Sequence, residues 1–390
     1  MKKNIAFCAG LLAGTLLAAT VEAQVSPKTH PSTYTSSQVA TSGEEGPGAD
    51  GSVQTVLSAL TTLPEADTLI YINPQRILNE AVPRFMPEKD VADMRSGFNQ
   101  LKQNVGIDPA KIEYIILAVR FKKPSAGLSF IPPEFMLVAG GDMSADSLLV
   151  LARMASGGKL RDEKYGNKTI GLMTVEQIAK QAETNLLLKS FAEIAIVPLN
   201  ANTIAVGTTA YLKAAVDAAE GKERLSREGL DSLLRDPTVL ISAAGSPLSS
   251  FKKTFGLLGT ETSPRPAGCD SAFGDFYASL TMDTNNFMLR GAMNADNPDT
   301  AKIINNLLSG LVQQAVNTVT DKATQSALKY FSIRPQENEI VLSADVPQQI
   351  VLDFIKAQAK PKAEVAPTAK PVTRAKKKRM VRRRVAKLGQ

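Results

Sequence analysis

Two overlapping Ser-x-x-Lys patterns have the spacing that best fits covalent chemistry in this sequence. Ser249 stands three residues before Lys252, and Ser250 stands three residues before Lys253. On a helix this spacing brings an amine within one turn of a hydroxyl, as in the penicillin-binding proteins and β-lactamases, where the serine is the nucleophile. The Ser-Asp-Asn and Lys-Thr-Gly elements of those enzymes do not occur here in the required order. An ordinary surface helix is therefore the favoured interpretation, and a Ser-Lys hydrolase or transferase of the cell envelope is the alternative.

The histidine and cysteine content argues against most other active sites. The chain has one histidine, His30, which lies in a segment rich in Ser, Thr, Gly and Pro, and two cysteines, Cys8 and Cys269. A Ser–His or Cys–His nucleophile needs a base held rigidly beside it, and a zinc site needs several such ligands. We therefore expect no cofactor and no metal. Cys269 is expected to be shielded, and an intermolecular disulfide is the alternative.

Oxygen-bearing side chains near one turn also raise the possibility of a calcium site. Asp283, Asn294, Asp296 and Asp299 are near one another in the sequence but lack the EF-hand spacing and its bidentate glutamate. Capping of a helix by Asp296 or Asn297 explains these residues more simply.

The strongest chemical signal is the positive charge at the C-terminal end. Residues 360–390 hold 12 of the 45 lysines and arginines and one acid, Glu364, a formal charge of +11. Residues 24–359 hold 31 bases and 36 acids, a net −5, so the pI of 9.2 belongs to the tail. A run of cations binds polyanions through counterion release, without reading a sequence. The residues predicted to make this contact are Lys376, Lys377, Lys378, Arg379, Arg382, Arg383 and Arg384.

Residues 1–23 have the pattern of a secretory signal peptide. Two lysines precede an uncharged apolar stretch at residues 5–19, and Ala23 supplies a small residue at the expected cleavage site. The stretch is short for a membrane span, and no later segment offers 18 consecutive apolar residues. We therefore expect an exported protein, periplasmic or extracellular, with no transmembrane segment after leader removal.

Composition divides the rest of the chain into a spacer, a body and a tail. Residues 24–58 are poor in large apolar residues and are predicted to be a disordered spacer. The body is about twice the usual domain size of roughly 150 residues, so we predict two α+β halves, residues 59–235 and 236–358. Residues 359–390 are predicted to be a disordered basic tail.

Strand pairs and amphipathic helices follow the same order in both halves of the body. The first half has predicted strands at 70–74, 112–121, 134–142, 191–199 and 203–207, and helices at 88–104, 144–156 and 208–221. The second half has predicted strands at 276–283, 287–294, 329–335 and 339–346, and helices at 297–320 and 347–358.

Side-chain periodicity supports these elements and their packing. In the helix at 297–320, Ile304, Leu308, Leu311 and Ala315 recur at helical spacing, and Ile303 widens the apolar stripe. The predicted fold class is α+β, with antiparallel sheets, helices on one sheet face, and internally duplicated strand-strand-helix units.

The segment Leu63-Pro64-Glu65-Ala66-Asp67-Thr68-Leu69-Ile70-Tyr71 resembles the opening of exported α+β proteins of environmental bacteria. Those proteins begin with Leu-Pro, small or acidic residues and a tyrosine-bearing strand, and continue with duplicated strand-strand-helix units. The resemblance covers the layout of residues 60–358. It implies an α+β body and no known activity, and it transfers no site residues.

These observations predict an exported, non-enzymatic α+β protein, a binding or structural component held by its basic tail. The expected partner is an anionic envelope polymer or a membrane surface. Nucleic acid is the less favoured polyanion because of the predicted export. Besides the Ser-Lys enzyme, a carrier of a lipid or small ligand is an alternative, for which a large apolar cavity between the halves would be the sign. The oligomeric state stays open.

Overall fold

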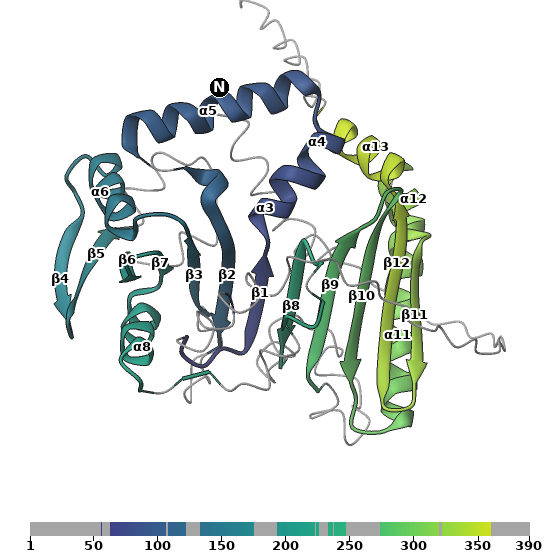
Figure 1. The fold of residues 1–390 in the computed structure, drawn as a ribbon. Helices are drawn as coiled ribbons and strands as arrows, with labels where there is room; N and C mark the ends of the chain where they lie inside the picture. Colours follow the sequence, from purple (N-terminus) through teal and green to yellow (C-terminus); the bar gives the residue numbers. More distant parts are fainter. Residues whose placement is uncertain are drawn as a thin grey trace, which may run out of the picture. The chain divides into compact units, whose positions relative to one another are not determined.

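The structure of the protein is a computed structural model that describes residues 56, 63–106, 108–121, 133–174, 193–222, 224–225, 233–236, 238–246, 274–319 and 322–359. All of these residues belong to one unit, Gly48–Gln390. Their twelve strands form a single sheet in the order β11-β12-β10-β9-β8-β1-β2-β3-β7-β6-β5-β4 (Figure 1). Every neighbouring pair is antiparallel. The fold class is therefore α+β with a large antiparallel sheet, as the sequence predicts.

The strands are β1 (Thr68–Ile72), β2 (Ile112–Arg120), β3 (Glu134–Gly141), β4 (Arg161–Tyr165), β5 (Lys168–Thr174), β6 (Glu193–Asn200), β7 (Thr203–Gly207), β8 (Ile241–Gly245), β9 (Phe276–Met282), β10 (Asn286–Asn294), β11 (Phe331–Gln336) and β12 (Glu339–Pro347). The helices are α3 (Pro74–Arg76), the π-helical turn η1 (Ile77–Ala81), α4 (Val82–Phe85), α5 (Glu88–Val105), the 3₁₀ turn η2 (Pro109–Lys111), α6 (Ala145–Ala155), α8 (Thr209–Ala219), α11 (Pro298–Thr318), α12 (Lys322–Leu328) and α13 (Gln348–Ala359).

The chain follows the same path on both sides of the central β1–β8 pair. After β1 come the neighbours β2 and β3, then α6, then the hairpin β6–β7, whose second strand pairs with β3. After β8 come the neighbours β9 and β10, then α11, then the hairpin β11–β12, whose second strand pairs with β10. The hairpin β4–β5 is added at the outer side of β6.

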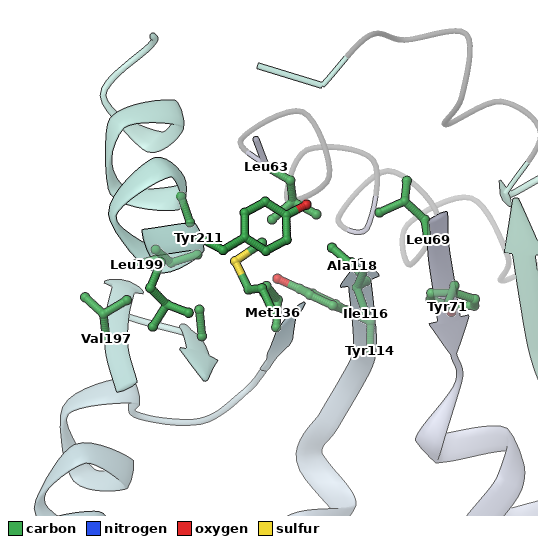
Figure 2. Close-up of a cluster of buried hydrophobic side chains, with 14 of the residues drawn as sticks. Leu63, Leu69, Tyr71, Tyr114, Ile116, Ala118, Met136, Val197, Leu199 and Tyr211 are labelled. Atoms are coloured by element: carbon green, nitrogen blue, oxygen red, sulfur yellow. The ribbon is translucent and has the colours of Figure 1, made fainter. Parts of the chain in front are cut away.

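The main core lies on one face of the sheet, beneath α8. Tyr114 and Ile116 of β2, Met136 of β3 and Val197 of β6 point to this face and contact Tyr211 and its neighbours on α8 (Figure 2). All five of these side chains are at most 2% exposed. This burial is the main hydrophobic stabilisation of the first half of the chain.

A second apolar cluster lies on the opposite face, beneath α6. It contains Ala139 of β3, Ile204 of β7 and Ala145 of α6. Successive residues of a strand point to opposite faces, and Ala139 directly follows Val138, which belongs to the main core. Helices α6 and α8 therefore cover opposite faces, and the prediction that the helices share one face is wrong for this pair. The physical reason is that β3 is apolar on both sides and needs cover on both.

Helix α11 begins where the sequence predicts, but its apolar stripe is only partly covered. The Asn297 side chain accepts a hydrogen bond of 2.8 Å from the N–H of Thr300, and Pro298 occupies the first helical position. Ile304 is 3% exposed, whereas Ile303 is 53% exposed and Leu311 is 40% exposed. The stripe is therefore wider than the surface of β11 and β12 that the helix contacts.

Candidate functional site

A half-buried ion pair between the end of β2 and the start of β3 is the most distinctive polar arrangement in the described residues. Arg120 donates two hydrogen bonds to one carboxylate oxygen of Glu134, of 3.0 Å from Nε and 2.6 Å from Nη2. The Glu134 side chain is 6% exposed and that of Arg120 is 33% exposed. The Arg120 guanidinium also lies 4.5 Å from the ring centroid of Tyr211 on α8. The pair therefore joins two strands of the sheet to the helix that covers them.

The same cluster anchors the chain that enters β1. The Tyr211 hydroxyl donates a 2.9 Å hydrogen bond to the backbone oxygen of Glu65, and burial raises the pKa of this phenol well above its ordinary value. Tyr211 therefore stays protonated at neutral pH and acts as a donor, not as a base. A buried hydrogen bond of 3.1 Å between the Tyr114 and Thr203 hydroxyls links β2 to β7 across the intervening β3 in the same core.

Asp67 connects three strand ends at this position. Its carboxylate accepts a 2.7 Å hydrogen bond from the N–H of Phe121, directly after β2, and its backbone oxygen accepts one of 2.8 Å from Ser246, directly after β8. Burial raises the pKa of the Asp67 carboxyl, while the Phe121 hydrogen bond and the charge of Arg120 partly oppose that shift. This cluster links β1 with its two neighbours, and its charges are engaged with each other. Its chemistry fits a structural clamp.

Two recesses of about 500 Å³ each lie beside hairpin turns, one in each half of the chain. One is lined by Asn294, the last residue of β10, by Ala295 directly after it, and by residues 336–339 at the β11–β12 turn. The other is lined by residues along α6, from Asp146 to Arg153, and by residues of the β4–β5 and β6–β7 hairpins, among them Asn167 and Asn200. Both are open and lined mainly by polar side chains. Within the described residues, they do not have the apolar lining that a lipid carrier requires.

The oxygen-bearing residues considered for calcium do not meet. Asp283 precedes β10 and Asn294 ends it, so the nine-residue strand separates them by about 30 Å. Asp283 accepts hydrogen bonds from the N–H groups of Asn285 and Asn286, each of 2.6 Å, and so closes the β9–β10 turn. In the described part of the chain, no group of three or more His, Cys, Asp and Glu residues is placed to hold a metal ion.

The helix that precedes the basic tail, α13, begins in contact with the sheet. Gln348, the first residue of α13, donates through Nε2 to the backbone oxygen of Asp283 at 2.9 Å, and its own N–H donates to the oxygen of Asn285 at 2.8 Å. Arg84 of α4 donates to the same Asp283 oxygen at 2.7 Å. Helix α13 therefore starts from a firm contact with the β9–β10 turn and ends at Ala359, where the basic segment begins.

The other residues singled out from the sequence lie outside the described residues. These are the Ser-x-x-Lys residues Ser249, Ser250, Lys252 and Lys253, the residue Cys269, the seven tail residues Lys376, Lys377, Lys378, Arg379, Arg382, Arg383 and Arg384, and the leader and most of the spacer. No described helix is both long enough and apolar enough to cross a membrane.

The Arg120 cluster was not predicted from the sequence, although a signal for it exists. Arg120 and Glu134 are opposite charges at the ends of two mainly apolar strands, IEYIILAVR, whose other charge is Glu113, and EFMLVAGG. A charge at the edge of such a run needs a partner when it is buried. The pairing of these two strands brings the two residues opposite each other.

Comparison with known proteins adds a distant structural likeness. No protein-family model matches this chain, and no curated protein matches it. Crystal form III of TP0453 matches with a TM-score of 0.40 and 11% sequence identity, over 77% of this chain and 97% of that chain. Crystal form IV matches with a TM-score of 0.37 and 10% identity, over 76% and 95% of the two chains. Form I gives a TM-score of 0.38 and 9% identity, over 77% and 96%. A likeness of this size assigns no function to this chain.

Proposed function

We propose that the protein is an exported, non-enzymatic binding or structural component whose C-terminal arm, residues 360–390, attaches it to an anionic envelope polymer or membrane surface. The observation that carries this proposal is the separation of charge along the chain. The arm has a formal charge of +11, whereas residues 24–359 have a net charge of −5. Attraction to a polyanion therefore resides in the arm, and the body contributes repulsion.

The contacts at the start of α13, the helix that precedes the arm, support this division of roles. The contacts of Gln348 with Asp283 and Asn285 hold the start of α13 on the sheet, at the residue where β12 ends. Because the start of α13 is bonded to the sheet, attachment of the arm that follows this helix would also hold the sheet domain at the surface. The sequence of residues 360–374, with its alternating Pro, Ala and Lys, is typical of extended linkers.

The body fits a duplicated unit, which we propose as its architecture. The outer hairpins of the two halves share a pattern of Ile, Pro, Asn and Ile, at positions 196, 198, 202 and 204 in β6–β7 and 333, 335, 338 and 340 in β11–β12. In both hairpins the proline lies opposite the second isoleucine, as Pro198 with Ile204 and as Pro335 with Ile340. The shared chain path and the shared pattern both support residues 59–235 and 236–358 as the two units.

Binding to anionic surfaces under two salt conditions tests the role of the arm. The protein without its leader, residues 24–390, is mixed with isolated cell envelope or with anionic lipid vesicles, and bound protein is measured by co-sedimentation. Two variants are run beside it. One ends at Ala359, and the other carries glutamine at each of the seven basic positions between 376 and 384. The second variant keeps the length of the arm and removes only charge.

We expect the affinity of the full-length protein to fall by roughly a thousandfold between 50 and 200 mM salt, if the arm makes six or more ionic contacts as DNA-binding proteins do. Both variants should bind weakly and with little dependence on salt. Strong binding of the variant that ends at Ala359 would contradict the proposal and would locate the binding site in the sheet domain. Comparison of vesicles with the polymer fraction of the envelope identifies the anionic partner.

A further inference from the structure

The two outer edges of the sheet differ sharply in charge. Four of the five residues of the edge strand β4 are charged, and three of the four form ion pairs. These ion pairs are Arg161 with Glu193 at 3.0 Å, Asp162 with Arg153 at 2.9 Å, and Glu163 with Lys213 at 2.6 Å. Charged side chains on an edge strand oppose the addition of another strand. The opposite edge strand, β11, has the sequence FSIRPQ and carries one charge, on Arg334.

The backbone of β11 directs hydrogen-bonding groups to its outer side, which no other described strand covers. The N–H of Ala295 donates to the oxygen of Asn338, and the N–H of Gln348 donates to that of Asn285, so the even-numbered residues of β12 bond to β10. The odd-numbered residues of β12 therefore form their backbone hydrogen bonds with β11. In the register of this pair, the odd-numbered residues of β12 lie opposite the even-numbered residues of β11, so it is the even-numbered residues of β11 that bond to β12. Phe331, Ile333 and Pro335 consequently direct their backbone groups outward, and proline has no N–H to donate. In the described part of the chain, no strand pairs with this side of β11.

The corresponding edge in the first half of the chain accepts a strand. The outer side of β6 pairs with β5 from Glu193 to Ile196, and the pairing stops two residues before Pro198. In β11, Ile333 and Pro335 have the same spacing and the same place in their hairpin. The same geometry that receives β5 in one half is thus present, without an added strand among the described residues, in the other half.

We propose that β11 pairs antiparallel with β11 of a second copy of this chain, about a two-fold axis at Ser332. This register is set by the outward groups. It places Phe331 opposite Ile333 of the second copy, so both outward N–H groups of each chain find carbonyl partners. A register centred on Ile333 would also form four hydrogen bonds, but it would place the Phe331 carbonyl opposite Pro335, which has no N–H to donate. In the register centred on Ser332, four intermolecular hydrogen bonds pair both the N–H and the carbonyl groups of Phe331 and Ile333 in each copy.

The side chains at this edge complement each other in the same register. On the face that carries α11, two contacts form between the aromatic ring of Phe331 and the branched side chain of Ile333 of the second copy. On the other face, Tyr330, which is 41% exposed, lies opposite the exposed Arg334 of the second copy, where a guanidinium can stack on the ring. The edge is therefore complementary to itself, as a two-fold interface requires. This inference is independent of the proposed role of the basic arm.

Single-cysteine crosslinking tests the register. The protein used is residues 24–390 with Cys269→Ser, in about 0.5 M salt, where charge interactions of the arm are screened. In the proposed dimer the two Ser332 residues form a non-hydrogen-bonded pair with Cα atoms about 4.5 Å apart, within disulfide reach. Ser332→Cys should form a disulfide-linked dimer under mild oxidation. Arg334→Cys is the matched control on the same strand and face, because the two copies of residue 334 would be about 13 Å apart.

The molar mass in solution provides the second measurement. Light scattering should show the protein shifting from monomer to dimer as its concentration rises, and Ile333→Pro, which removes one outward N–H, should shift the dissociation constant upward at least tenfold. Circular dichroism checks that this variant stays folded. A monomer at every concentration, or equal crosslinking of the two cysteine variants, would overturn the proposal. Crosslinking of Ser332→Cys alone, with dimerisation of the parent protein, would support it.

Discussion

Removal of Arg120 is expected to destabilise the fold more than removal of Glu134, although both changes break the same ion pair. The two side chains differ in burial, with Glu134 at 6% exposure and Arg120 at 33%. Arg120→Met leaves a carboxylate buried without its guanidinium, and breaking a buried pair in this way costs about 3–5 kcal/mol. Glu134→Met leaves a guanidinium that water can reach and that still stacks on Tyr211, so we expect a cost of about 1–2 kcal/mol.

Urea unfolding followed by circular dichroism measures these free energies of unfolding. The double variant Arg120→Met with Glu134→Met should be more stable than Arg120→Met alone, because it also removes the buried carboxylate that has lost the Arg120 guanidinium. Lys111→Met serves as the control, since its partner Asp142 lies 2.9 Å away on the exposed surface. An exposed pair contributes at most about 1 kcal/mol. A larger loss for Glu134→Met than for Arg120→Met would refute the reasoning from burial.

Two further predictions concern pH and helix capping. Burial raises the pKa of the Asp67 carboxyl in the folded protein, so as pH rises the unfolded chain loses the carboxyl proton before the folded protein does. The contribution of Asp67 to stability is therefore largest below pH 3.8, and it is lost as pH rises through the folded-state pKa. The free energy of unfolding of the natural protein, minus that of Asp67→Asn, should therefore increase as pH falls from 7 to 4. Urea titrations at each pH measure this difference, and a difference that does not change with pH would contradict the prediction. Asn297→Ala removes the side-chain acceptor at the start of α11, and Ser144→Ala removes the equivalent acceptor at α6, where Ser144 accepts from Ser147 at 3.2 Å. Each should lower the free energy of unfolding by about 1 kcal/mol, and no loss in either would show that solvent replaces the cap.

Local sequence patterns were sufficient for most of the elements and insufficient for their arrangement in layers. Helix α11 was predictable from an Asn cap, a Pro at the first position and a repeating apolar stripe. Strand β4 was not, because RDEKY lacks the alternation of a half-buried strand and is held by ion pairs and by β5. Strand β8 was missed for another reason, since in ISAAG the one large residue, Ile241, is followed only by small residues, although the strand lies between β1 and β9.

Long-range contacts explain the rest of what sequence reasoning could not provide. The Arg120–Glu134 pair depends on the register between β2 and β3, and that register follows from the way both strands and their connection fit together, which neither strand shows alone. Similarly, the run of apolar residues in β3 shows that both sides of this strand are apolar, but it does not show which helix covers which side. The charge separation between body and arm needed no structure, because it depends only on composition.

The two proposals, arm attachment and pairing through β11, are coupled if both hold. In the proposed dimer the axis passes at Ser332, which lies opposite Ser343 of β12, and each α13 begins five residues further along, at Gln348. The two-fold axis directs these starting points to opposite ends, about 33 Å apart along the strand direction. Each arm has 31 residues and spans at most about 100 Å when extended, so both arms can reach one polymer.

Binding of the second arm is then intramolecular, and the apparent affinity for a polyanion rises with the fraction of protein that is dimeric. Ile333→Pro should therefore weaken attachment to a long polyanion while leaving attachment to a short one, which spans a single arm, unchanged.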